Sequence, residues 1–209
     1  MRCVVSVLAV AATTCFATAD LVDPLIPTWR GDANTAFAQW DSFTSATGGP
    51  NAPEQGGGWN LFNFGSGAII ASSGNIYGAS GALNIHVYPG GAPMYNMQEA
   101  VVNISFAGNP IDVNDVRALV GSAEDGTFVT GTPEFRGGDG GFSPQTYAFT
   151  FDLSNVAFGF QSLSFFFGSE EANSSLDAIS IDVLGQAVPA PGALALLGLA
   201  GFARGRRRD

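Results

Sequence analysis

A run of oxygen-bearing side chains late in the chain has the composition of a calcium site. Glu170, Glu171, Asn173 and Asp177 follow the aromatic stretch 165–169. Calcium takes about six to eight oxygen ligands from carboxylates, amides and backbone carbonyls, and loops supply these readily. Because this loop follows an aromatic strand, it is expected to be held at a rigid end of the sheet. These four residues are therefore the best candidates for binding a metal ion. No other cofactor is expected.

Other acidic groups leave the choice of a calcium site open. None of the groups has the spacing of an EF-hand loop, and a solvated acidic loop is the alternative reading of each. The further groups are Asp112 with Asn114 and Asp115, Glu124 with Asp125, and Asp139 within a glycine run.

Catalytic side chains are scarce. The chain has no lysine, its single histidine is His86, and its cysteines, Cys3 and Cys15, both lie near the N-terminus. No Gly-x-Ser-x-Gly turn is present to expose a nucleophilic serine. We therefore assign no catalytic residue and expect no enzymatic activity. An acidic-pair glycoside hydrolase remains an alternative, because two carboxylates suffice for that chemistry.

Carbohydrate binding is the second kind of site that the composition favours. Sugars bind aromatic faces beside Asp and Asn side chains. Trp29 lies two residues after Pro27 and precedes Arg30, and Trp59 follows three glycines, so both are candidates for glycan contact. Trp40 and Trp59 also suit a hydrophobic core, and this alternative stays open.

The elements that must position these residues are β-strands. Apolar residues alternate with polar ones over 83–88, 101–106, 147–152 and 179–183, and glycine and proline recur between such segments. Residues 158–167 are apolar enough for a strand buried on both faces. Residues 112–120 fit a helix or a strand. The pattern predicts an all-β fold, an antiparallel β-sandwich that is jelly-roll-like.

The body of the chain is strongly acidic. Of eight basic residues, five arginines lie in the two terminal segments, and Asp209 is the one terminal acid among 18. This leaves 17 acids against three arginines, a net charge of −14 for residues 20–187. Such a charge repels phosphate backbones, so nucleic acid is excluded as an expected partner.

The N-terminus predicts export. Arg2 precedes an apolar run over residues 4–12, and Ala17 and Ala19 form an Ala-x-Ala cleavage site before Asp20. This is the pattern of a secretory signal peptide over residues 1–19, with signal peptidase as a partner. The ectodomain is expected over residues 20–187, as one domain.

The C-terminal residues 188–209 combine a proline-bounded segment, a short apolar run and an arginine cluster. Val188, Pro189, Ala190 and Pro191 precede the apolar run 193–203. The arginines that follow are Arg204, Arg206, Arg207 and Arg208. As a helix the run would measure about 18 Å, whereas a stable span needs about 20 residues, so we expect a short hydrophobic helix that inserts transiently. The arginines would stay on the cytoplasmic side.

This tail resembles the PEP-CTERM sorting signal of exosortase-dependent bacterial surface proteins. In that family Val-Pro-Glu-Pro precedes a Leu/Ala/Gly-rich span and arginines, and here Ala190 stands in place of the glutamate. The resemblance implies processing by an exosortase-like membrane protease and a final place in the cell envelope surface or the extracellular matrix of a biofilm. It implies a structural or adhesive role. A carbohydrate-binding module is the alternative, with extracellular polysaccharide as the partner.

Overall fold

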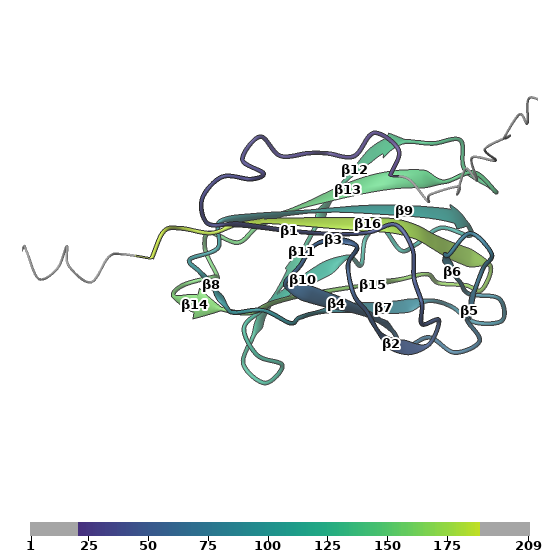
Figure 1. Ribbon diagram of the computed structural model, residues 1–209, viewed down its shortest axis with the longest axis horizontal. Coiled ribbons are helices and arrows are strands. Elements are labelled where there is room, and N and C mark those ends of the chain that lie inside the picture. Colours follow the sequence, from purple (N-terminus) through teal and green to yellow (C-terminus); the bar gives the residue numbers. More distant parts are fainter. Residues whose placement is uncertain (1–20, 189–209) are drawn as a thin grey trace, which may run out of the picture.

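Two antiparallel sheets packed face to face form the body of the molecule (Figure 1). The computed structural model describes residues 21–188. The predicted antiparallel β-sandwich is confirmed, and the strands between residues 35 and 184 make one continuous hydrophobic core. The predicted signal peptide and almost all of the predicted sorting segment, including its hydrophobic helix, lie outside the described residues.

The first sheet contains the longest strands. Its order is β12 (Thr132–Gly137), β13 (Gln145–Asp152), β9 (Glu99–Gly108), β16 (Ser174–Leu184), β1 (Thr35–Trp40) and β3 (Gln55–Gly56). Two short strands, β5 (Ile69–Ile70) and β6 (Ile76–Tyr77), extend it beside the start of β16. The central pair, β9 and β16, is in register from Glu99 opposite Leu184 to Gly108 opposite Ser174.

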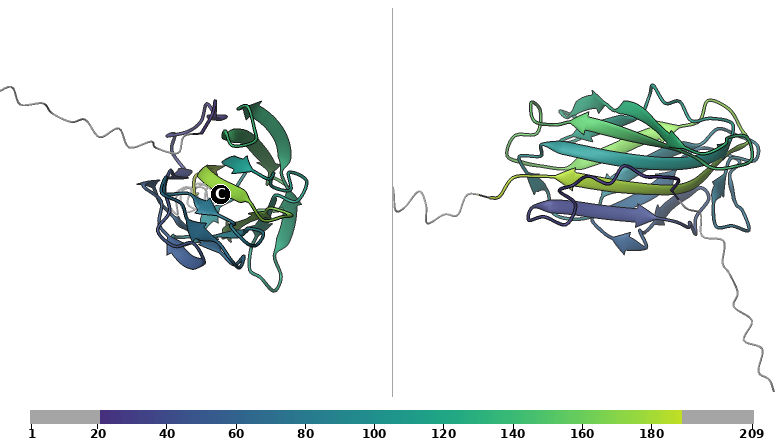
Figure 2. Two further views of the ribbon diagram at one scale, coloured as in Figure 1. Left: turned by 90° about the vertical axis from the view of Figure 1, so that its right-hand side faces the viewer. Right: turned by 90° about the horizontal axis from the view of Figure 1, so that it is seen from above.

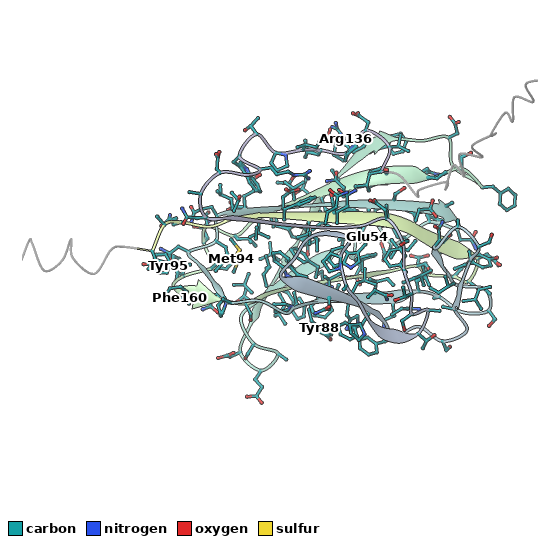
Figure 3. The ribbon with its side chains drawn as sticks, in the orientation of Figure 1. Glu54, Tyr88, Met94, Tyr95, Arg136 and Phe160 are labelled. Carbon is teal, nitrogen blue, oxygen red and sulfur yellow. The ribbon has the colours of Figure 1, made fainter. Side chains whose placement is uncertain are left out.

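The second sheet lies below the first in Figure 1. Its order is β11 (Thr127–Thr130), β10 (Arg117–Val120), β15 (Leu163–Gly168), β7 (Asn84–Pro89), β4 (Trp59–Asn63) and β2 (Gly48–Asn51). A separate small pair, β8 (Met94–Tyr95) and β14 (Phe160–Gln161), lies at one end of the sandwich, where Figure 3 labels Met94, Tyr95 and Phe160.

The alternation in the sequence places apolar side chains between the sheets. Ile85 and Val87 of β7 are fully buried, as are Ile179, Ile181 and Val183 of β16. The view along the sandwich in Figure 2 shows the two layers that enclose them. Burial of apolar area contributes roughly 25 cal/mol per Å², so this core is the main source of stability.

One predicted strand differs from the structure, and one ambiguous segment is resolved by it. Residues 158–167 do not form one strand buried on both faces: they divide into β14 and β15, and Phe158 and Phe160 are 66% and 59% exposed. The break follows from Gly159, whose φ of +72° turns the chain there. For residues 112–120, which fitted a helix or a strand, the structure has a turn followed by the strand β10.

Residues 21–34, which we call the N-terminal strap, run along the outer face of the first sheet (Figures 1 and 2). The Val22 amide donates to Thr146 Oγ1 at 2.7 Å. Asn103, fully buried on β9, accepts from the Leu25 amide at 2.7 Å and donates to the Leu25 carbonyl at 3.1 Å. These bonds attach the strap to the sheet at two strands.

An ion pair secures the end of the strap nearest to β1. Arg30 donates from Nε and Nη2 to the two carboxylate oxygens of Asp182, each at 2.5 Å. The Asp182 side chain is fully buried, and the Arg30 guanidinium lies 4.3 Å from the centre of the Phe37 ring. Burial raises the pKa of Asp182, and Arg30 opposes that rise. The pair is a bidentate contact of the strong kind.

Candidate functional site

The outer face of the second sheet is covered with aromatic rings. Alternation along β4, β7 and β15 sends the apolar core residues inward and leaves rings on the outside. We call the set the aromatic face. Its members are Phe62, Phe64, His86, Tyr88, Phe128 and Phe166. Figure 3 shows Tyr88 on this outer side, directed away from the first sheet.

The rings of the aromatic face form one continuous surface. His86 lies at the centre, with its ring centroid 4.8 Å from those of both Phe64 and Phe166. Tyr88 lies 5.7 Å from Phe62 and 5.9 Å from Phe166. Phe128 extends the surface 5.8 Å beyond Phe166. Phe64 and Phe128, at its two ends, are 52% and 53% exposed.

His86 takes part in this surface as a neutral ring. Its Nε2 lies 2.9 Å from Asn84 Oδ1, an acceptor, and its Nδ1 lies 2.8 Å from the Tyr88 hydroxyl. The tautomer that satisfies both contacts carries its proton on Nε2 and accepts from Tyr88. Burial lowers the pKa of His86, which favours the neutral form further. The histidine therefore lies among rings on the surface rather than beside a nucleophile.

A cavity of about 460 Å³ opens at one end of the aromatic face. His86, Phe128 and Phe166 supply its aromatic wall. Its polar side chains include Asn84, Asp112, Asp115, Arg117 and Glu170. An aromatic wall with a few convergent polar groups is the usual composition of a small-molecule site.

Arg117 links the polar and aromatic parts of this cavity. Its guanidinium lies 5.2 Å from the centre of the Phe128 ring, and its Nη2 donates to Asp115 Oδ2 at 3.2 Å. The side chains of Arg117 and Asp115 are 41% and 56% exposed. The arginine is thus neutralised by its neighbour, and its planar group is held beside the ring. A sugar could stack on the rings while its hydroxyls bond to these polar groups.

The structure corrects one of the two predicted glycan residues. Trp59 is only 6% exposed, and its Nε1 donates to the Leu163 carbonyl at 2.9 Å, so it belongs to the core. Trp40 is likewise buried and bonds to the Asn51 carbonyl. Trp29 is partly exposed, but it lies in the N-terminal strap over the first sheet, away from the aromatic face.

The predicted calcium residues are divided among three cavities. Glu170 lines the cavity of the aromatic face and shares a further cavity with Glu171. Asn173 and Asp177 line another, at the end of the first sheet. Glu171 is exposed and accepts from the Asn109 side chain at 3.5 Å. Within residues 21–188 no group of three or more His, Cys, Asp or Glu side chains is arranged to hold a metal ion. Calcium binding stays a prediction.

No family model matches the chain, and no curated protein shows significant similarity to it. Across the part of the chain that the structure describes, no helix is both long and apolar enough to cross a bilayer.

Proposed function

We propose that this chain is an exported surface or matrix protein whose sandwich adheres to a neutral polysaccharide through the aromatic face. The observation that carries the proposal is the continuous set of rings from Phe64 to Phe128, bordered by the polar groups of the 460 Å³ cavity. Exposed apolar patches of this kind mark binding surfaces on soluble proteins. The role is adhesive and non-enzymatic.

The charge of the chain favours a neutral glycan over an anionic one. Residues 20–187 carry 17 acids and three arginines. Each of those arginines is paired with a carboxylate: Arg30 with Asp182, Arg117 with Asp115, and Arg136 with Asp23 and Glu134. Few positive charges are left to attract uronic acids or sulfates, so stacking and hydroxyl hydrogen bonds must supply the affinity.

Export and sorting are part of the same proposal, and they rest on the two terminal segments. Signal peptidase would release the chain before Asp20, and an exosortase-like membrane protease would remove the arginine-rich end after transient insertion. The intact mass of protein recovered from the producing cells tests this: we expect a loss of residues 1–19 and of Arg204–Arg208. A mass that retains the arginines would contradict the processing.

Adhesion is tested by retention of the purified full chain on insoluble neutral polysaccharides. The double variant Phe64→Ala/Phe128→Ala should bind about tenfold more weakly, because each lost ring contact contributes about 0.5–1.5 kcal/mol. Phe158→Ala is the matched control, since Phe158 is 66% exposed and lies outside the aromatic face. Equal losses in both variants, or retention by neither wild type nor control, would refute the proposal.

The same cavity keeps one alternative open, an acidic-pair glycoside hydrolase. Asp112, Asp115 and Glu170 all line it, and paired carboxylates beside a bound sugar are the groups that such enzymes use. Release of soluble sugar by wild type, abolished by Glu170→Gln or Asp115→Asn, would replace adhesion with hydrolysis as the function.

A further inference from the structure

A second cavity, of about 670 Å³, lies at the end of the first sheet, where β6, β9 and β16 meet the β12–β13 connection. Its position and lining separate it from the aromatic face. The residues that line it are Asn75, Tyr77, Ala107, Gly108, Asn109, Gly141, Phe142, Pro144, Asn173, Ser175 and Asp177. None of them is basic, and the one carboxylate is Asp177.

Asp177 occupies this cavity because of a β-bulge. The register between β16 and β9 shifts between Leu176 and Ala178, so Asp177 is an extra residue with no partner on β9. The residue is 3% exposed. Asn75 Nδ2 and Ser175 Oγ both donate to its Oδ1. Burial raises the pKa of Asp177 to about 6, so at neutral pH the cavity holds a buried negative charge.

Asn75 adds an unused acceptor to the same place. Its Nδ2 is fixed toward the Asp177 carboxylate, because the opposite amide orientation would bring two acceptor oxygens together. Its Oδ1 is buried, and within residues 21–188 it has no hydrogen-bond partner. A buried acceptor without a partner lowers stability, and a ligand N–H that bonds to it would remove this cost.

Two aromatic rings complete the lining. The Tyr77 hydroxyl donates to Asn173 Oδ1 at 2.8 Å, which anchors its ring at the cavity. Phe142 lies fully exposed at the mouth. Aromatic faces attract organic cations through the negative potential over the ring. The cavity thus combines a carboxylate, a free carbonyl oxygen and two rings.

We propose that this cavity binds a protonated primary amine carried on a small organic group, as in a deacetylated amino sugar or a lysine side chain. The ammonium donates to Asp177 and to Asn75 Oδ1, and its carrier packs against Tyr77 and Phe142. A metal ion fits less well, because the Asn75 N–H groups point at the only carboxylate. The site is independent of the aromatic face.

Titration of the purified full chain with glucosamine, N-acetylglucosamine and Nα-acetyl-lysine amide tests this proposal, with the Asn75 and Asn109 side-chain amides followed by NMR. We expect saturable shifts with glucosamine that N-acetylglucosamine does not produce. Binding of the lysine amide as well would show that the ammonium alone is recognised, and its failure would assign the site to amino sugars. Saturation by neither amine, or equal binding of the acetylated sugar, would overturn the proposal.

Variants connect the shifts to the named residues. Asp177→Asn should weaken glucosamine binding at least about tenfold, the effect of losing a charged partner. Phe142→Ala should weaken it by about two- to fivefold. Asp125→Asn makes the same charge change in an exposed loop and should leave the affinity unchanged. An Asp177→Asn variant that keeps its folded spectrum and binds like wild type would refute the site.

The pH dependence of ligand affinity distinguishes direct binding by Asp177 from a purely structural role of this residue. Affinity for the lysine amide should fall as the pH drops below about 6, since Asp177 is then protonated. Tyr77 is the other titratable group of the lining, and Glu171 lies beyond it, against Asn109. An affinity that stays constant from pH 8 to about pH 5 would contradict the role of Asp177.

Discussion

The two outer faces of the sandwich differ in what they bury. On the first sheet, Asn103, Ser180 and Asp182 are polar, fully buried and covered by the N-terminal strap. On the second sheet the central outward residues are rings, and Phe64 and Phe128 at the two ends of this set are 52% and 53% exposed. One face is closed by directed hydrogen bonds, and the other is left available.

This difference shows how the same sheet architecture serves two purposes. Buried polar groups need specific partners, so the first sheet depends on the strap to satisfy Asn103 and Asp182. Rings need no such partner and can remain in contact with water at modest cost. The stability of the molecule should therefore depend on the polar contacts of the first face much more than on the rings of the second.

Arginine replacements on the two faces give the largest expected contrast. Arg30→Ala leaves the Asp182 carboxylate buried without its partner and should lower the free energy of unfolding by about 3–5 kcal/mol. Arg117→Ala, on the second face, breaks an exposed pair and should cost at most about 1 kcal/mol. Urea denaturation of both variants provides the measurement. Equal losses would mean that the faces do not differ as described.

Asp177, at the end of the first sheet, is a buried carboxylate without an arginine partner, so its effect on stability should depend on pH. Its pKa is about 6 in the folded protein against an ordinary 3.8, so the folded state holds the proton more strongly. Its contribution to stability therefore decreases as the pH rises from about 4 to about 6 and stays low above that. Asp177→Asn should raise the free energy of unfolding by about 3 kcal/mol at pH 8 and by little at about pH 4. A gain of the same size at both pH values would exclude titration of Asp177 as its cause.

A ring replacement on the aromatic face should have the smallest effect on stability. Phe64 is 52% exposed and its ring stacks 6.1 Å from that of Phe62. Phe64→Ser should lower the free energy of unfolding by about 0.5–1 kcal/mol. Thermal and urea unfolding would measure this. A loss above about 2 kcal/mol would indicate that this face contributes to the packing rather than to binding.

Local periodicity was sufficient to predict the strands with clear alternation but not the sites. The alternation at 83–88 and 179–183 predicted β7 and β16 correctly, because a half-buried strand needs that pattern. The aromatic face depends instead on which strands are neighbours: Phe62, His86 and Phe166 come together only because β4, β7 and β15 pair in this order. No signal within any one segment indicates that pairing.

The burial of Trp59 and the separation of Glu170 from Asp177 have the same physical origin. Trp59 follows three glycines, which suggested an exposed loop, but its position in β4 turns it inward against Leu163. Glu170 and Asp177 are close in sequence, yet the turn before β16 sends them to different cavities. Side-chain direction in a sheet is set by register, and one bulge, here at Asp177, changes it.

The position of β16 has a mechanical consequence. The strand is paired with β9 along its whole length and with β1 over residues 179–184. The chain leaves β16 after Leu184, at the end of the strand that is farther from Asp177. A pull on the chain beyond Leu184, directed along the strand, would load both ladders in shear, because their hydrogen bonds lie perpendicular to that direction. Such bonds must break together rather than one at a time. A tether at this end would hold the sandwich under tension without peeling a strand away.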